Sequence, residues 1–182
     1  LRVMGGTIDL SGLDNPSGQN AEIALRIAGA APQVVQFLAR PKLGLSKDVL
    51  YDPKRVGGEV TIDLGLAFPL IDALTVADLK ISADAELREG SLKDALGDVD
   101  LSYADIRVKY GNSELSVAGQ GKFDGHAVDI GWRELFGAKV PFRRRYELKG
   151  TVPAALVGKA GFPSPEPFVT GPVGIAIQYQ VA

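Results

Sequence analysis

The residues of this chain that could do acid–base chemistry are few and scattered. His126 is the only histidine, and it directly follows the Asp124-Gly125 turn with no evident acidic or hydroxyl partner beside it. Nothing around Ser113 or Ser116 resembles the strand-to-helix turn that exposes a nucleophilic serine. The sequence leaves open a Ser-His-Asp arrangement built from distant residues, but it favours an exposed turn residue over a catalytic base.

Carboxylates are the other candidate catalytic groups, because a pair of them can hydrolyse a glycosidic bond. Asp78, Asp84 and Glu86 alternate with Lys80 and Arg88 along one segment. Acids interleaved with bases at a period of two are typical of a solvated, charge-balanced strand face. Hydrolysis of envelope glycans is therefore a minor hypothesis, and we expect a protein that is not an enzyme and has no cofactor or metal.

One basic cluster could contact lipid phosphates. It consists of Arg143, Arg144 and Arg145, and guanidinium groups match phosphate oxygens in geometry and charge. The alternative is a surface strand entry whose arginines pair with neighbours such as Glu134 or Glu147. The glycines add no phosphate loop, since none of the glycine pairs precedes a helix as a dinucleotide fingerprint requires.

Composition places the chain among folded globular proteins. Its 182 residues suffice for one substantial core, so we expect a single domain over residues 1–182, with 46% hydrophobic and 23% charged residues. A formal net charge of -2 argues against a nucleic-acid partner. The chain begins at Leu1 without an initiator methionine and ends within a strand pattern, so we expect a segment of a longer protein.

The elements that position these groups are strands with one apolar side. From 59 to 68 the sequence alternates strictly, and successive side chains of a strand point to opposite faces. Val60, Ile62, Leu64, Leu66 and Phe68 lie on one side, and Glu59, Thr61, Asp63 and Gly65 on the other.

The same signature recurs along the chain and predicts about ten antiparallel strands in sequence order. The expected strands cover 2–10, 21–29, 60–68, 76–88, 99–103, 106–110, 115–123, 128–132, 146–148 and 173–181. We expect a bulge near Ala104, tight hairpins at Gly111-Asn112 and Asp124-Gly125, and short helices from Pro32 and from Pro153. The helices are too few to cover the apolar side, so either two sheets close on each other or the apolar side is a working surface.

A resemblance to a known family comes from the second half of the chain. The sequence GKFDGHAVDIGWRELFGAKVPFRRRYELKGTVPAALVGKAGF contains a Phe-Asp-Gly hairpin, a strand with Trp132, an Arg-Tyr strand and a Pro-Ala-Ala-Leu helix. The earlier VGGEVTIDLGLAFPL fits the same pattern. These segments resemble the AsmA-like periplasmic proteins, in the branch related to YhdP and TamB.

The resemblance implies a fold, a place and a role. The expected fold is mainly β, an antiparallel meandering and strongly twisted sheet that forms an open, taco-like groove or incomplete barrel with two short helices. The parent protein would be anchored in the inner membrane of a Gram-negative bacterium by parts outside this segment and would extend into the periplasm. Its role would be to carry phospholipids between the inner and outer membranes, with acyl chains, and further envelope proteins, as partners.

Physical chemistry agrees with an apolar groove for acyl chains. Each methylene withdrawn from water contributes about 0.8 kcal/mol, so a chain of roughly 14 methylenes gains on the order of 10 kcal/mol before entropy and incomplete contact are subtracted. The candidate lining residues are Val60, Ile62, Leu64, Leu66, Leu79, Ile81, Leu87, Val117, Ile175 and Ile177. The alternative function is a closed β-sandwich that acts as a scaffold in outer-membrane biogenesis.

Overall fold

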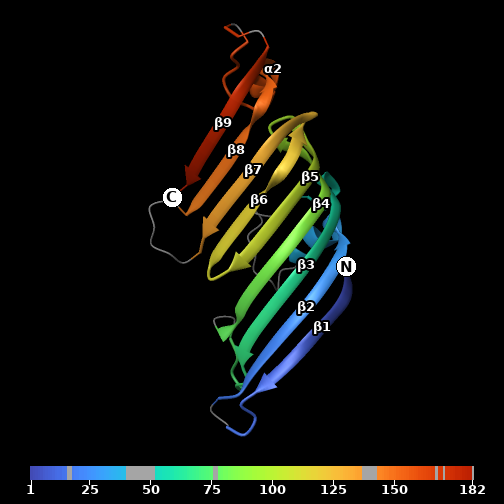
Figure 1. The fold of residues 1–182 in the computed structure, drawn as a ribbon, viewed down its shortest axis with the longest axis vertical. Helices are drawn as coiled ribbons and strands as arrows, with labels where there is room; N and C mark the ends of the chain where they lie inside the picture. The colour runs from blue at the N-terminus through green and yellow to red at the C-terminus, as the bar shows by residue number, and fades with distance from the viewer. Residues whose placement is uncertain are drawn as a thin grey trace.

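The computed structural model describes residues 1–15, 18–39, 52–75, 78–136, 143–166, 168–169 and 171–181. Within them, nine strands form one antiparallel sheet in sequence order, with β1 and β9 at its two open edges (Figure 1). The strands are β1 (Arg2–Ser11), β2 (Asn20–Ala30), β3 (Val56–Pro69), β4 (Lys80–Leu96), β5 (Val99–Gly111), β6 (Glu114–Phe123), β7 (His126–Leu135), β8 (Arg144–Pro153) and β9 (Pro172–Val181). The predicted fold class, a mainly β open antiparallel meander with two short helices, is confirmed.

The predicted division of residues 99–110 into two strands is wrong, because β5 continues through its bulge from Val99 to Gly111. The register against β6 shifts between Ser102 and Asp105, and Tyr103 has a φ of 48°. The expected bulge near Ala104 is thus present, but the chain continues beyond it in the same strand. The predicted start of the fourth strand at Val76 lies outside the described residues, and β4 begins at Lys80.

Two-residue turns join β6 to both of its neighbours, β5 and β7. Asp124 and Gly125 have φ values of 45° and 89°, which confirms the hairpin predicted from this dipeptide. The other predicted turn is shifted by one residue. Asn112 and Ser113 occupy the positive-φ positions, at 51° and 59°, while Gly111 is the last residue of β5.

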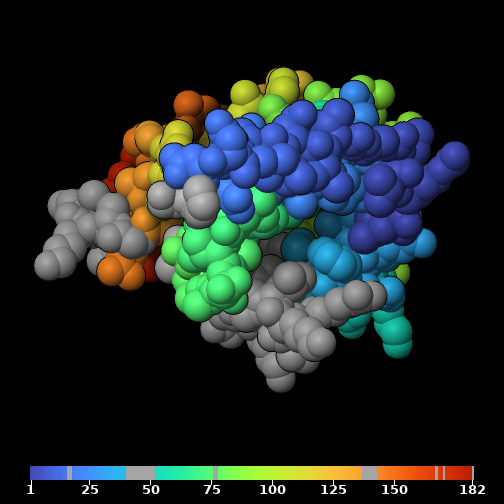
Figure 2. Space-filling model, turned by 90° about the horizontal axis from the view of Figure 1, so that it is seen from below, coloured from blue at the N-terminus to red at the C-terminus, as the bar shows by residue number. Residues whose placement is uncertain are grey.

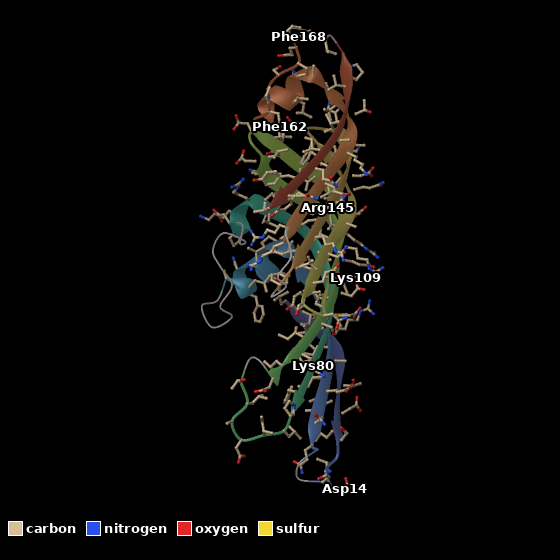
Figure 3. The ribbon with its side chains drawn as sticks, turned by 90° about the vertical axis from the view of Figure 1, so that its left-hand side faces the viewer. Asp14, Lys80, Lys109, Arg145, Phe162 and Phe168 are labelled. Atoms are coloured by element: carbon tan, nitrogen blue, oxygen red, sulfur yellow. The ribbon has the colours of Figure 1, made fainter. Side chains whose placement is uncertain are left out.

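Both α-helices lie on one face of the sheet and at the same strand ends. Helix α1 (Ala31–Leu38) directly follows β2, and α2 (Ala154–Lys159) directly follows β8. Since β2 and β8 run in the same direction in the meander, their last residues lie at the same end of the sheet. Figure 3 shows both helices on the side opposite to Lys109 and Arg145. A 3₁₀ turn, η3 (Pro53–Arg55), precedes β3.

The buried core is small and sits beneath α2. It consists of Val99, Phe123, Val128, Val152 and Leu156, and among these Val99 and Val152 are almost completely buried. Strand β1, by contrast, is exposed along its whole length, and the view from below shows it at the surface (Figure 2). Burial therefore seals one corner of the sheet and leaves much of it partly open.

Candidate functional site

The cross-strand register gathers the apolar side chains onto one face, which we term the apolar face. Directly opposed residues of neighbouring strands share a face, so the pairing can be followed across the sheet. One complete row runs through Ile27, Ile62, Ala85, Val108, Val117, Trp132, Tyr146 and Tyr179. The next row runs through Val60, Leu87, Ile106, Gly119, Ile130, Leu148 and Ile177. The sheet thus carries a continuous apolar floor from β2 to β9.

The structure brings nearly all of the predicted lining residues together on this face. Nine of them lie in strands on the apolar face, five in the two rows above and four in parallel rows, namely Val60, Ile62, Leu87, Val117 and Ile177, and then Leu64, Leu66, Ile81 and Ile175. Leu79 lies one residue before β4, and the hollow that it lines with Ile81 beside the β5–β6 hairpin also contains Glu22, Lys80 and Ser82 from the opposite side of the strands. The use of the predicted lining residues in lipid binding stays a prediction.

The apolar face is only partly withdrawn from water. Most of its aliphatic side chains are half-buried, Ile81 is 39% exposed, and Ile8 at the β1 edge is 68% exposed. Helices α1 and α2 cover the strand ends at one border and leave the rest of this face without a covering helix among the described residues. The apolar face is therefore bordered on one side by helices α1 and α2 and is otherwise open.

The opposite face carries charges in pairs. Arg107 donates two hydrogen bonds to Asp84, of 2.9 and 2.8 Å, and Arg133 lies 2.7 Å from Glu114. The hydrogen bond from Arg107 lowers the pKa of Asp84, and the same bond raises the pKa of Arg107. We term this surface the polar face. It confirms the predicted charge-balanced strand face for Asp84 and Glu86, which pair with Arg107 and Arg88. Asp78, however, precedes β4 and accepts hydrogen bonds from Thr75.

The three consecutive arginines are divided between the two faces. Arg144 lies on the apolar face with its Nε 2.7 Å from Oε1 of Glu134, whereas Arg145 pairs with Glu147 at 2.7 Å on the polar face. Arg143 precedes β8 and is exposed. The alternative in which these arginines pair with Glu134 and Glu147 describes Arg144 and Arg145 correctly. Contact with a lipid headgroup stays a prediction.

An aromatic stack on the apolar face was not among the predicted site residues. The ring of Trp132 stacks on Tyr146 with centroids 5.6 Å apart, and Tyr146 stacks on Tyr179 at 6.3 Å. The Nε1 of Trp132 is buried, and no described residue accepts its hydrogen. The period-two pattern placed each ring on the apolar side, but their contact depends on the register between strands.

A narrow cleft lies between helix α2 and the apolar face of the sheet. The cleft is lined entirely by apolar residues, including Leu148 and Ile177 of the floor and Leu156 of the helix. Lys159 of α2 forms an ion pair with Asp124 in the β6–β7 turn, and this hydrogen bond lowers the pKa of Asp124 and raises that of Lys159. The helix is thereby attached to the hairpin ends of the sheet.

Asp84 and Glu86 lie on the polar face, whereas His126 shares the side of Val128 and Ile130 at one end of β7. His126 is half-buried at the start of β7 and lines a shallow hollow with Thr151 and Glu166. Within the described ranges, no three His, Asp or Glu side chains are grouped so that they could hold a metal ion.

Comparison with known proteins gives no match. No family model, curated protein or solved structure resembles this chain closely enough to be identified. No helix among the described residues is long and apolar enough to cross a membrane.

Proposed function

We propose that this chain is a non-enzymatic lipid-binding segment whose apolar face holds phospholipid acyl chains. The observation that supports the proposal is the contrast between the faces of one open sheet. One face carries apolar rows across eight strands, β2 to β9, with the Glu134–Arg144 pair at one end, and the other carries ion pairs such as Arg107–Asp84 and Arg133–Glu114. Soluble monomers rarely expose a contiguous apolar patch larger than a few hundred Å², so such a floor marks a binding surface.

The floor suits an acyl chain better than a compact ligand. Its side chains are aliphatic in successive rows, and neighbouring rows lie about 7 Å apart along a strand. A chain lying across them can shift from row to row with little change in contact, because the hydrophobic effect is non-directional. Binding and movement of this kind require no catalytic residue.

The setting of this activity is part of the proposal. In it, the segment belongs to a longer protein anchored in the inner membrane of a Gram-negative bacterium and forms part of a periplasmic route for phospholipids to the outer membrane. Support comes from the resemblance to the AsmA-like proteins together with an open β meander of the kind that the resemblance implies.

The scaffold hypothesis predicts a different arrangement. It requires the apolar face to be sealed by a second sheet, yet the described residues form one sheet only. A closed sandwich is thus absent from the described part of the chain, and a role in assembly would need the second sheet to come from a partner.

The proposal is tested by one pair of variants at neighbouring positions. Ile81→Asp places a charge on the apolar face at a residue that is already 39% exposed, so the fold should tolerate it. Ser82→Asp places the same charge on the opposite face. We expect Ile81→Asp to reduce co-purified phospholipid and transfer between vesicles several-fold, and Ser82→Asp to leave both unchanged. Equal lipid binding in both folded variants would overturn the proposal.

A further inference from the structure

The apolar face changes in polarity along β7, β8 and β9. Successive cross-strand rows, each two residues further along the strands, are charged, aromatic, aliphatic and then buried. The rows are Glu134–Arg144–Val181, with its charges on β7 and β8, then Trp132–Tyr146–Tyr179, Ile130–Leu148–Ile177, Val128–Gly150–Ile175 and finally Val152–Val173 beneath α2. This order is that of an amphiphile from its head to the end of its tail.

At the charged end of this series, the positively charged side chain of Arg144 is accessible to solvent. In the Glu134–Arg144 pair, the glutamate side chain is 8% exposed and the arginine side chain is 39% exposed. The accessible part of the pair is therefore the guanidinium, whose planar donors match the oxygens of a phosphate. The pair fixes the position of that guanidinium on the apolar face.

The aromatic row provides the chemistry of a membrane interface. Tryptophan and tyrosine combine an apolar ring with a polar tip, and they are enriched where hydrocarbon meets headgroups. The buried Nε1 of Trp132 lacks an acceptor among the described residues, and a buried donor without an acceptor is unfavourable. Because this atom is closed to solvent, the aromatic row offers its ring surfaces instead, and Tyr146 and Tyr179 are 36% and 61% exposed.

The aliphatic rows end at the cleft under α2. Leu148 and Ile177 line both the floor and this cleft, so the two surfaces are continuous. Val157 and Phe162 line the cleft from the helix side, and Phe162 is 38% exposed (Figure 3). The helix thus closes the path along the strands at the apolar end of the series.

We infer that this corner of the sheet binds one phospholipid in a fixed orientation, parallel to the strands. Its phosphate lies at Arg144, its ester groups beside the Trp132–Tyr146–Tyr179 row and the methyl end of one acyl chain at the mouth of the narrow cleft under α2. From Tyr146 to Val152 the strand spans about 20 Å at about 3.4 Å per residue. One acyl chain spans about 15 Å, half of the hydrocarbon core of a bilayer, and therefore fits within this length. The inference rests on the proposed function and adds to it a defined site and a defined orientation of the bound phospholipid.

The orientation can be measured because Trp132 is the only tryptophan of the chain. Its fluorescence would be recorded with phospholipids that carry a nitroxide quencher either near the ester groups or near the methyl end of an acyl chain. A second protein, Trp132→Phe with Phe162→Trp, reports from the cleft. The control, Trp132→Phe with Lys149→Trp, reports from the polar face. Bound lipid is quantified separately for every protein by co-elution.

The expected result is a reversal between the two reporters. Trp132 should be quenched several-fold more strongly by the nitroxide near the esters, the tryptophan at 162 more strongly by the nitroxide near the methyl end, and the tryptophan at 149 by neither. Equal or reversed quenching with lipid bound would overturn the inference and leave the proposed function standing. Absence of bound lipid in every protein would overturn both, and binding of labelled fatty acid in place of phospholipid would contradict the choice of ligand.

Discussion

Lys159 at the end of α2 and Asp124 in the β6–β7 turn form an ion pair across 35 residues of sequence. The same aspartate accepts a hydrogen bond of 3.1 Å from the backbone N–H of Asp100 through its Oδ1. The turn therefore connects α2 to the ends of β5 and β6. This contact holds the helix over the core and over the closed end of the apolar face.

The Lys159–Asp124 pair predicts a dependence of stability on pH. The hydrogen bond from Lys159 lowers the pKa of Asp124, so its contribution is present above the ordinary carboxyl value of about 3.9 and is lost as pH falls through the lowered value. The pKa of Lys159 is raised by the same bond, so its contribution is present below about 10.4 and is lost as pH rises through the raised value.

Asp124→Asn removes the charge, and its amide oxygen can still accept from Asp100. We expect a lower Tm for this variant near neutral pH and a smaller difference from the unmodified protein in acid. Asp72→Asn, at an exposed aspartate of the β3–β4 connection, is the matched control and should leave the Tm unchanged. A constant difference in Tm between Asp124→Asn and the unmodified protein at all pH values would contradict the role of the charge.

The core beneath α2 predicts which large apolar side chains contribute to the free energy of unfolding. Leu156 is 9% exposed and packs with Val99 and Phe123, so Leu156→Ala should lower the free energy of unfolding by about 2–5 kcal/mol. Phe168 is 91% exposed, and Phe168→Ala should change the free energy of unfolding by less than about 0.5 kcal/mol. Urea denaturation measures both, and similar losses in the two variants would show that α2 does not seal a core.

Close packing of strands β5 and β6 predicts a position that excludes even a methyl group. A Cβ on Gly119 would lie 2.1 Å from the carbonyl oxygen of Asp105 and 2.8 Å from the Cα of Ile106. Both are backbone atoms that cannot move without disturbing the sheet, so Gly119→Ala should lower the free energy of unfolding by about 1–3 kcal/mol. Gly174 of β9 has open space at its Cβ position, and Gly174→Ala should be tolerated. A Gly119→Ala protein as stable as Gly174→Ala would disprove this packing.

Alternation along single strands predicted the faces of the sheet from sequence. The period of two is a property of the extended backbone itself, so Val60 and Ile62 could be assigned to one side before any strand pairing was known. The same alternation could have assigned Arg144 and Arg145 to opposite faces, and it places Glu134 on the side of Trp132. Alternation alone could therefore have shown that both charges lie on the apolar side, although not that they pair with each other.

Contacts between strands could not be predicted in this way. The stacking of Trp132 on Tyr146 depends on the register between β7 and β8, which is set by the connection that joins them. The attachment of α2 to the Asp124 turn likewise depends on where the helix leads after β8. Local pattern determines which side a residue faces, and long-range pairing determines its neighbours.

The most direct test of the central claim is photo-crosslinking from single positions on the two faces, followed by mass spectrometry of captured lipid. Probes at Ile62 and Leu79 take apolar positions of the strand alternation, and probes at Asp63 and Lys80 are the adjacent controls at polar positions. The account predicts phospholipid adducts at Ile62 and Leu79 and none at Asp63 or Lys80. Folded protein with no adduct at any of the four positions would contradict it and would indicate that protein covers the apolar face.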